Sequence, residues 1–113
     1  MIEIKRENVT DISGIKFVAE QDGKIVGRAF LYVLKNELHQ NPRWGFLEDV
    51  FVEEEYRKHG IGSRLVEAII AEAKVQSCYK LICTSRNEKP ELHSYYEKFG
   101  FKNYGLEFRM DLS

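Results

Sequence analysis

The sequence predicts one α/β domain in which a mixed, mostly antiparallel β-sheet is flanked by helices. The first half of the chain holds short apolar or alternating segments separated by turn residues, a pattern typical of strands. The second half holds an amphipathic helical pattern and a second, shorter helical segment. A chain of 113 residues, 43% of them hydrophobic, suits a single core, so residues 1–113 are predicted to form one domain.

Strands are predicted in the first half over residues 1–5, 15–20, 25–34 and 44–52. The second and third of these strands should form a hairpin, because the Asp22-Gly23 pair between them is one that tight hairpin turns favour. Residues 6–14 are polar and are predicted to be a connection. A loop that contains Pro42 leads to the fourth strand.

Helices are predicted over residues 63–76 and 91–99, and further strands over residues 79–85, 101–104 and 106–112. Leu65, Ile69 and Ala73 fall on one stripe of the first helix. Pro90 suits the first turn of the second helix, and Gly100 its end. The apolar, β-branched strand after the first helix should be buried on both faces. The predicted order is β-β-β-β-α-β-α-β-β.

A loop of basic and glycine residues stands directly before the first predicted helix. Its basic residues are Arg57, Lys58 and His59, and its glycines are Gly60 and Gly62. The first N–H groups of a helix lack intrahelical partners and carry partial positive charge, and glycine lets an anion approach the backbone. The loop therefore predicts a cradle for a diphosphate. The alternative is an ordinary strand-to-helix turn that uses glycine for a positive φ.

Two segments resemble one protein family. The run Arg57-Lys58-His59-Gly60-Ile61-Gly62 resembles the (Arg/Gln)-x-x-Gly-x-(Gly/Ala) signature of the GNAT superfamily, the acetyl-CoA-dependent N-acetyltransferases. The run Tyr-Tyr-Glu-Lys-Phe-Gly-Phe at residues 95–101 is similar to that family's closing segment. The resemblance runs from Lys24 onward and implies a GNAT-like sheet.

The chain departs from the family pattern near its start. GNAT proteins usually place one or two helices between their first and second strands, and here only residues 6–14 are available. Those helices commonly cover the acceptor side of the domain. The acceptor pocket is therefore expected to be open or to be completed by a second subunit in a homodimer.

The resemblance implies acetyl-CoA as cosubstrate and assigns residues to hold it. The pantetheine arm would pair with the backbone of one strand as an added strand pairs with a sheet edge, and the N–H of Val50 could polarise the thioester carbonyl. Asn87 resembles a family asparagine that contacts the cofactor, although it lies two residues further from Tyr96 than is common. The implied cofactor-binding residues are Val50, Phe51, Val52, Arg57, Lys58, His59, Gly60, Ile61, Gly62, Ser63 and Asn87.

Acetyl transfer to an amine also needs a base and an acid. Glu48 and Asp49 are the candidate bases; adjacent strand residues face opposite ways, so only one can point into a given cleft. Apolar neighbours should raise the pKa of that carboxyl. The alternatives are a solvent-facing acid, a salt bridge, or a water chain without a single base. Tyr96 matches the family's tyrosine and would protonate the leaving thiolate; the alternative is a core aromatic.

Composition restricts the other classes of partner. Lys plus Arg number 17 and Asp plus Glu 18, so the charge of -1 argues against nucleic acid as a partner. Neither the cysteines, Cys78 and Cys83, nor the histidines show metal-ligand spacing, so no metal is expected. A signal peptide and a transmembrane-length apolar run are not apparent, which predicts a cytoplasmic protein with no membrane partner.

The predicted function is acetyl transfer from acetyl-CoA to a primary amine, on a small molecule or a peptide, by direct attack. The strings Leu-Glu-Asp-Val at residues 47–50 and Cys-Tyr-Lys at residues 78–80 resemble the glucosamine-6-phosphate N-acetyltransferases, although many small relatives share them. The alternative is a non-catalytic acyl-CoA-binding or regulatory module that kept the cofactor cleft.

Overall fold

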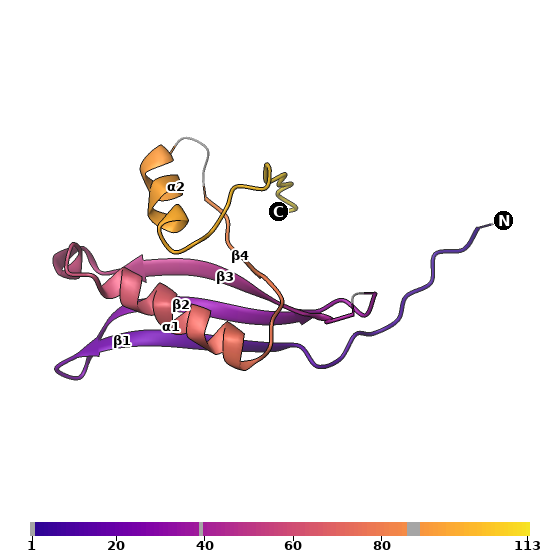
Figure 1. Cartoon of the computed structure of the whole chain (residues 1–113), viewed down its shortest axis with the longest axis horizontal. Coiled ribbons are helices and arrows are strands. Elements are labelled where there is room, and N and C mark those ends of the chain that lie inside the picture. Colours follow the sequence, from indigo (N-terminus) through magenta and orange to yellow (C-terminus); the bar gives the residue numbers. More distant parts are fainter. Residues whose placement is uncertain (1, 39, 86–88) are drawn as a thin grey trace.

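A computed structural model describes residues 2–38, 40–85 and 89–113. Its elements are β1 (Ser13–Gln21), β2 (Lys24–Lys35), β3 (Arg43–Val52), a 3₁₀ turn (Glu54–Tyr56), α1 (Ile61–Val75), β4 (Leu81–Ile82) and α2 (Pro90–Glu97). Helix α1 runs along the sheet, and α2 stands beyond β3 at one end of it (Figure 1). The predicted fold class, a mixed sheet flanked by helices, is confirmed.

The sheet has the strand order β1-β2-β3-β4. The first two neighbouring pairs are antiparallel and the third, β3 with β4, is parallel. The predicted hairpin between β1 and β2 is confirmed, with Gln21 opposite Lys24 and positive φ angles of 50° at Asp22 and 78° at Gly23. Two successive positive φ angles define the turn that matches the twist of the flanking strands, and the Asp-Gly pair adopts it at little cost.

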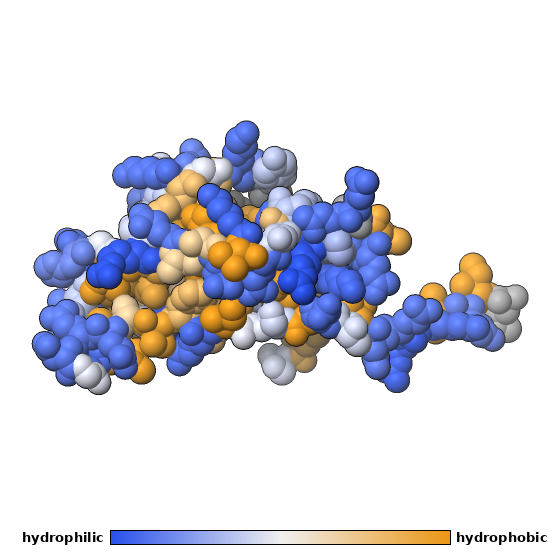
Figure 2. All heavy atoms as spheres, turned by 60° about the horizontal axis from the view of Figure 1, so that its bottom comes forward, coloured by the Kyte–Doolittle hydropathy of each residue, from blue (hydrophilic) through white to orange (hydrophobic). Residues whose placement is uncertain are grey.

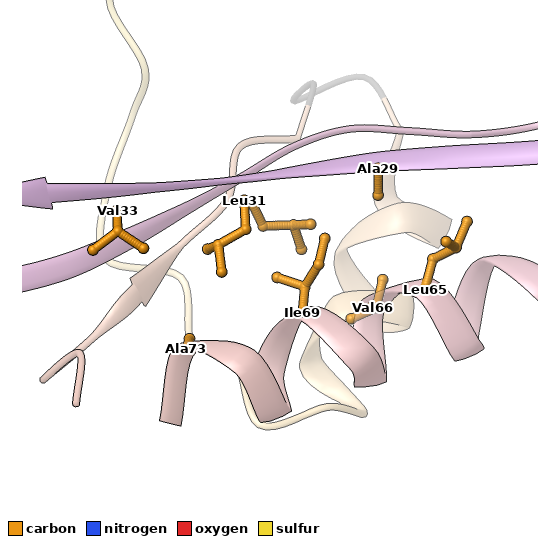
Figure 3. Packing of buried hydrophobic residues seen from close by; sticks show 8 residues of the cluster. Ala29, Leu31, Val33, Leu65, Val66, Ile69 and Ala73 are labelled. Carbon is orange, nitrogen blue, oxygen red and sulfur yellow. The ribbon is translucent and has the colours of Figure 1, made fainter. Parts of the chain in front are cut away.

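The core lies between the sheet and α1 (Figure 3). Alternate residues of β2 point to one face of the sheet, and residues three and four apart on α1 form the stripe that covers them. The buried side chains of this cluster are Ala29, Leu31, Val33, Leu47, Leu65, Val66, Ile69 and Ala73. The stripe predicted from the sequence is therefore the face that α1 buries.

Replacing Ile69 by alanine should lower the free energy of unfolding by about 2–5 kcal/mol, because the side chain is fully buried and its loss leaves a cavity. Urea denaturation measures the change. The matched control is Val75→Ala at the end of the same helix, where the side chain is 76% exposed and the expected change is within about 0.5 kcal/mol. Equal effects of the two substitutions would contradict this description of the core.

Several predicted strands do not form. Residues 2–5, 101–104 and 106–112 contain no strand, and the strand predicted over residues 79–85 is reduced to β4. A strand needs a neighbour for its backbone hydrogen bonds, and β4 finds one only where Leu81 and Ile82 lie opposite Gly45 and Phe46. These two β4 residues are half-buried, so the expected burial on both faces was wrong.

The segment before β1 is exposed along its described length, and near its end the carboxylate of Asp11 lies 3.9 Å from the guanidinium of Arg43 in β3. Residues 2–12 contain no helix or strand, and the chain there extends away from the sheet before it enters the start of β1 (Figures 1 and 2). Its apolar residues Ile2 and Ile4 are almost fully exposed. No helix of the described residues could span a membrane.

Candidate active site

One edge of β3 pairs with β4 over only part of its length. At Gly45 and Phe46 the strand lies between β2 and β4, but from Leu47 to Val52 only β2 is paired with it in the described part of the chain. The backbone groups on the other edge of this segment are free to bond an extended ligand, as at other exposed strand edges. Val50, Phe51 and Val52, the residues predicted to pair with a pantetheine arm, lie on this free edge.

A bulge interrupts β3 in the same segment. Phe30 of β2 lies opposite Glu48, whereas Arg28, two residues earlier, lies opposite Phe51, so β3 carries one extra residue there. Asp49 lies at this bulge and adopts a left-handed backbone conformation with a φ of 56°. Bulges of this kind redirect the side chains around them and are frequent next to active sites.

The bulge corrects the prediction that the two candidate bases face opposite ways. Glu48 is the cross-strand partner of Phe30, and Asp49 reaches Arg28, which shares a face of β2 with Phe30. Both carboxylates are exposed rather than enclosed by apolar side chains. Asp49 forms an ion pair with Arg28. Arg28 Nε lies 3.2 Å from one carboxylate oxygen of Asp49, and Arg28 Nη2 lies 3.4 Å from the other.

Two arginines lie against the ring of Phe51. The guanidinium carbon of Arg28 is 4.7 Å from the centre of the Phe51 ring, and that of Arg57 is 5.4 Å from it. Arg57 Nε also donates a hydrogen bond of 2.8 Å to the carbonyl of Val52. Val50 and Val52 pack against the core, whereas Phe51 is not part of that cluster. The side chain of Arg57 therefore ties the glycine loop to the end of β3.

The glycine loop leads directly into α1. Gly60 is the N-cap residue with a φ of 80°, and α1 begins at Ile61, two residues before the predicted start. No side-chain hydrogen bond caps this helix, and its first turn holds no acidic residue. A Cβ at Gly60 would meet no atom within 4 Å. The N-terminus of α1 is thus open and electropositive, as a phosphate-binding site requires.

The remaining cradle residues flank this opening. Lys58, with a φ of 68°, and His59 are exposed just before it. Ile61, Gly62 and Ser63 form the first turn of α1 and are half-buried. The predicted cofactor residue Asn87 lies outside the described residues.

Helix α2 contacts the first turn of α1 through Tyr95. The Tyr95 hydroxyl is 3.1 Å from Ser63 Oγ, and a Cβ at Gly62 would lie 3.6 Å from the same hydroxyl and 3.8 Å from Val52. The start of α1, the end of β3 and α2 therefore converge at Gly62. The sequence analysis missed this role of Tyr95, because a hydrogen bond across 32 positions leaves no local signal.

Tyr96 points to the core side of α2. Its ring is half-buried against the core cluster and makes edge contacts with Tyr95, at 5.3 Å between ring centres, and with Phe101, at 5.9 Å. Burial raises the pKa of the Tyr96 hydroxyl to about 12, and Cys83 and Tyr95 add to this effect. Tyr96 is therefore a protonated donor at neutral pH. Burial also raises the pKa of the Cys83 thiol to about 11, which leaves it protonated and unreactive.

The raised pKa of Tyr96 predicts a loss of stability in alkaline solution. In the unfolded chain this phenol ionises near a pKa of about 10, whereas the folded chain keeps its proton until the pKa of about 12. Between these values the unfolded state releases a proton that the folded state retains, so rising pH favours unfolding. Urea denaturation from about pH 9 upward should show a smaller loss of stability for Tyr96→Phe than for the parent chain; parallel curves would contradict the buried phenol.

Among the described residues, no group of three histidine, cysteine or acidic side chains is placed to hold a metal ion. The site contains an open helix N-terminus at α1, a free edge of β3 after the bulge, and the half-buried Tyr96 on α2. It offers two exposed carboxylates on the face of the sheet that carries Arg28 and Phe30.

Comparison with known proteins identifies relatives of this chain. The sequence model of the acetyltransferase (GNAT) domain matches residues 13–103. The chain is 35% identical over 91 residues to a probable glucosamine 6-phosphate N-acetyltransferase 2 of Oryza sativa subsp. japonica, which covers 79% of this chain and 52% of the rice protein. It is 31% identical over 96 residues to a glucosamine 6-phosphate N-acetyltransferase of Trypanosoma brucei brucei, which covers 85% of this chain and 63% of that protein.

A solved structure shows the same architecture. The glucosamine-6-phosphate N-acetyltransferase of Arabidopsis thaliana superposes with a TM-score of 0.80 at 26% identity, over 88% of this chain and 67% of the other. The chain spans about half to two thirds of the length of the curated relatives named above.

Proposed function

The chain belongs to the GNAT acetyltransferase family, and from this premise we propose that it transfers the acetyl group of acetyl-CoA to a primary amine. The observation that carries the proposal is the convergence at Gly62 of the open N-terminus of α1, the end of the free edge of β3 and Tyr95 of α2, whose neighbour on the helix is Tyr96. Each of these can serve a different part of one extended, diphosphate-containing thioester.

The residues at the start of α1 and along the free edge of β3 are chemically suited to bind acetyl-CoA. The uncapped N–H groups at the start of α1, with the charge of Lys58 beside them, suit the diphosphate. The pantetheine arm is largely amide, so the free backbone groups of residues 50–52 can pair with it without side-chain contacts. When bound, acetyl-CoA supplies an activated acetyl group.

This chain's residues can then serve each step of direct transfer. The backbone N–H of Val50 would donate to the thioester oxygen while the amine nitrogen forms its bond to the carbonyl carbon. As the carbon–sulfur bond breaks, the Tyr96 hydroxyl would give its proton to the departing sulfur. The proton lost by the amine would pass to a carboxylate on the β3 bulge, directly or through water.

We propose Glu48 as that carboxylate. Asp49 is held by two contacts to Arg28, whereas Glu48 makes no ion pair with a described residue. Glu48→Gln should therefore lower kcat by about 10²-fold or more, and Asp49→Asn by less than about tenfold. Steady-state kinetics with a free-thiol readout compare the two; the reverse order would assign the role to Asp49, and two small effects would favour a water chain.

The acceptor we propose is a small amine, and glucosamine 6-phosphate is the first to test because the rice and trypanosome relatives are named for it. No helix of the described residues precedes β1, where the family pattern usually supplies cover for the acceptor side. A second copy could cover the acceptor side, and we propose that the protein works as a homodimer.

The test is a calorimetric titration with acetyl-CoA, with ATP and NAD as controls, followed by a free-thiol assay with glucosamine 6-phosphate and with a lysine peptide. Selective micromolar binding of acetyl-CoA and amine-dependent thiol release are expected. Absence of acetyl-CoA binding would overturn the proposal. Binding without turnover on any amine would leave a non-catalytic acyl-CoA module instead.

A further inference from the structure

Arg28 of β2 contacts the residues of β3 on both sides of Val50. Its Nε and Nη2 atoms lie 3.2 and 3.4 Å from the two carboxylate oxygens of Asp49, and its guanidinium carbon lies 4.7 Å from the centre of the Phe51 ring. The side chain of Val50 itself packs against the core, on the other face of the sheet. This segment of β3 is therefore held from both faces, and Arg28 holds it on the face opposite the core.

Asp49 has a backbone conformation that calls for such a contact. At the bulge, Asp49 and Val50 together stand opposite the single β2 residue Ala29. Bulges with a left-handed first residue ordinarily use glycine there, because a Cβ disfavours a positive φ. Asp49 adopts a φ of 56° without being glycine. A residue of this kind stays left-handed where its surroundings fix it, and the two contacts from Arg28 do so at the carboxylate.

The strength of these contacts suits the control of a local conformation. An ion pair between exposed side chains stabilises a fold only weakly, and here the side chains of Arg28 and Asp49 are 38% and 51% exposed. A left-handed aspartate is also only mildly unfavourable, since Asp and Asn adopt this conformation more readily than other residues with a side chain. Two small opposed effects set the conformation at the bulge, so loss of Arg28 would release the bulge and leave the fold intact.

We propose that Arg28 is a positioning residue for acetyl transfer, which holds the bulge so that the N–H of Val50 points at the thioester oxygen. This role rests on the proposed function, in which that N–H donates to that oxygen. The N–H belongs to the planar peptide group between Asp49 and Val50, so any rotation of the backbone at Asp49 turns it. A donor of this kind stabilises developing charge only when it is aimed at the oxygen. Arg28 thus acts through Asp49 and Phe51.

Kinetics and binding test the role together. Arg28→Ala should lower kcat by about tenfold or more while the affinity for acetyl-CoA stays within about twofold, because the donor contributes mainly in the transition state. The matched control is Arg43→Ala at the start of β3, since the Arg43 side chain is also 38% exposed and lies 3.9 Å from an aspartate, Asp11. Arg43→Ala should leave both quantities unchanged. Equal losses of kcat in the two variants would overturn the proposal.

Glycine at position 49 separates the bulge from any other role of Arg28. Glycine adopts a φ of 56° without a partner, so it makes the contact with Arg28 dispensable. In an Asp49→Gly background, Arg28→Ala should therefore lower kcat by less than about threefold. A further loss as large as that in the parent chain would mean that Arg28 does not act through the bulge, and the proposal would fall.

Infrared spectroscopy follows the same contact without turnover. A hydrogen bond from Val50 lowers the stretching frequency of the thioester carbonyl in bound acetyl-CoA, which is resolved by an isotope label at the carbonyl carbon. Arg28→Ala should raise this frequency, by less in the Asp49→Gly background, and Arg43→Ala should not change it. An unchanged frequency in Arg28→Ala would overturn the proposal.

The two levels of failure are distinguishable. A parent chain that binds acetyl-CoA without turnover on any amine would contradict the proposed acetyl transfer, while the carbonyl frequency would still decide whether Arg28 aims the N–H of Val50. A parent chain with full turnover and no effect of Arg28→Ala would overturn the role of Arg28 alone. Absence of acetyl-CoA binding would overturn both.

Discussion

Gly60→Glu should abolish the binding of acetyl-CoA. Gly60 caps α1 with a φ of 80°, and the space around its Cα is open, so a side chain there projects toward the ligand rather than into the protein. A carboxylate at the start of α1 would occupy the electropositive N-terminus that the diphosphate needs. Calorimetry should show a loss of affinity of at least about 100-fold, equivalent to about 2.7 kcal/mol.

The chain offers a matched control for this substitution. Gly23, in the β1–β2 turn, has a φ of 78° and equally open surroundings, so Gly23→Glu introduces the same backbone strain and the same charge away from the cradle. Its affinity for acetyl-CoA should be unchanged. Comparable losses in both variants would show that strain or net charge, and not the cradle, controls binding.

Tyr96→Phe should lower kcat by about 10²–10³-fold with little change in the affinity for acetyl-CoA. The substitution removes the hydroxyl proposed to protonate the leaving sulfur and keeps the ring that packs on Phe101. Because the pKa of this hydroxyl is about 12, Tyr96 stays protonated across neutral pH, and no loss of rate from its ionisation is expected below about pH 10. Single-turnover thiol release and calorimetry measure the two quantities separately.

Tyr95→Phe is the control for Tyr96→Phe. It removes a neighbouring hydroxyl that bonds Ser63 at the start of α1, so it should weaken acetyl-CoA binding and lower stability by about 1 kcal/mol with a smaller effect on kcat. If Tyr96→Phe kept full turnover while Tyr95→Phe lost it, the proton donor would be Tyr95 and the geometry of α2 would have to be reinterpreted.

The sequence by itself determined the elements that local chemistry controls. The alternation of β2, the Asp-Gly turn and the stripe of α1 each need only residues a few positions apart, and all three predictions are confirmed. The glycine loop before α1 was recognisable for the same reason, since the open N-terminus is a property of one short segment. The match of the GNAT domain to residues 13–103 confirms the family resemblance.

The tertiary structure alone decided which side chains meet. The bulge at Asp49 arises because β3 follows β2 with one extra residue, and it set both carboxylates on the face of Arg28 against the alternation rule. The contact of Tyr95 with Ser63 depends on how α2 docks on α1. The strand predicted over residues 79–85 is shortened to β4, and those predicted over residues 101–104 and 106–112 do not form, because strand propensity is local whereas a strand is stable only where a neighbour accepts its hydrogen bonds.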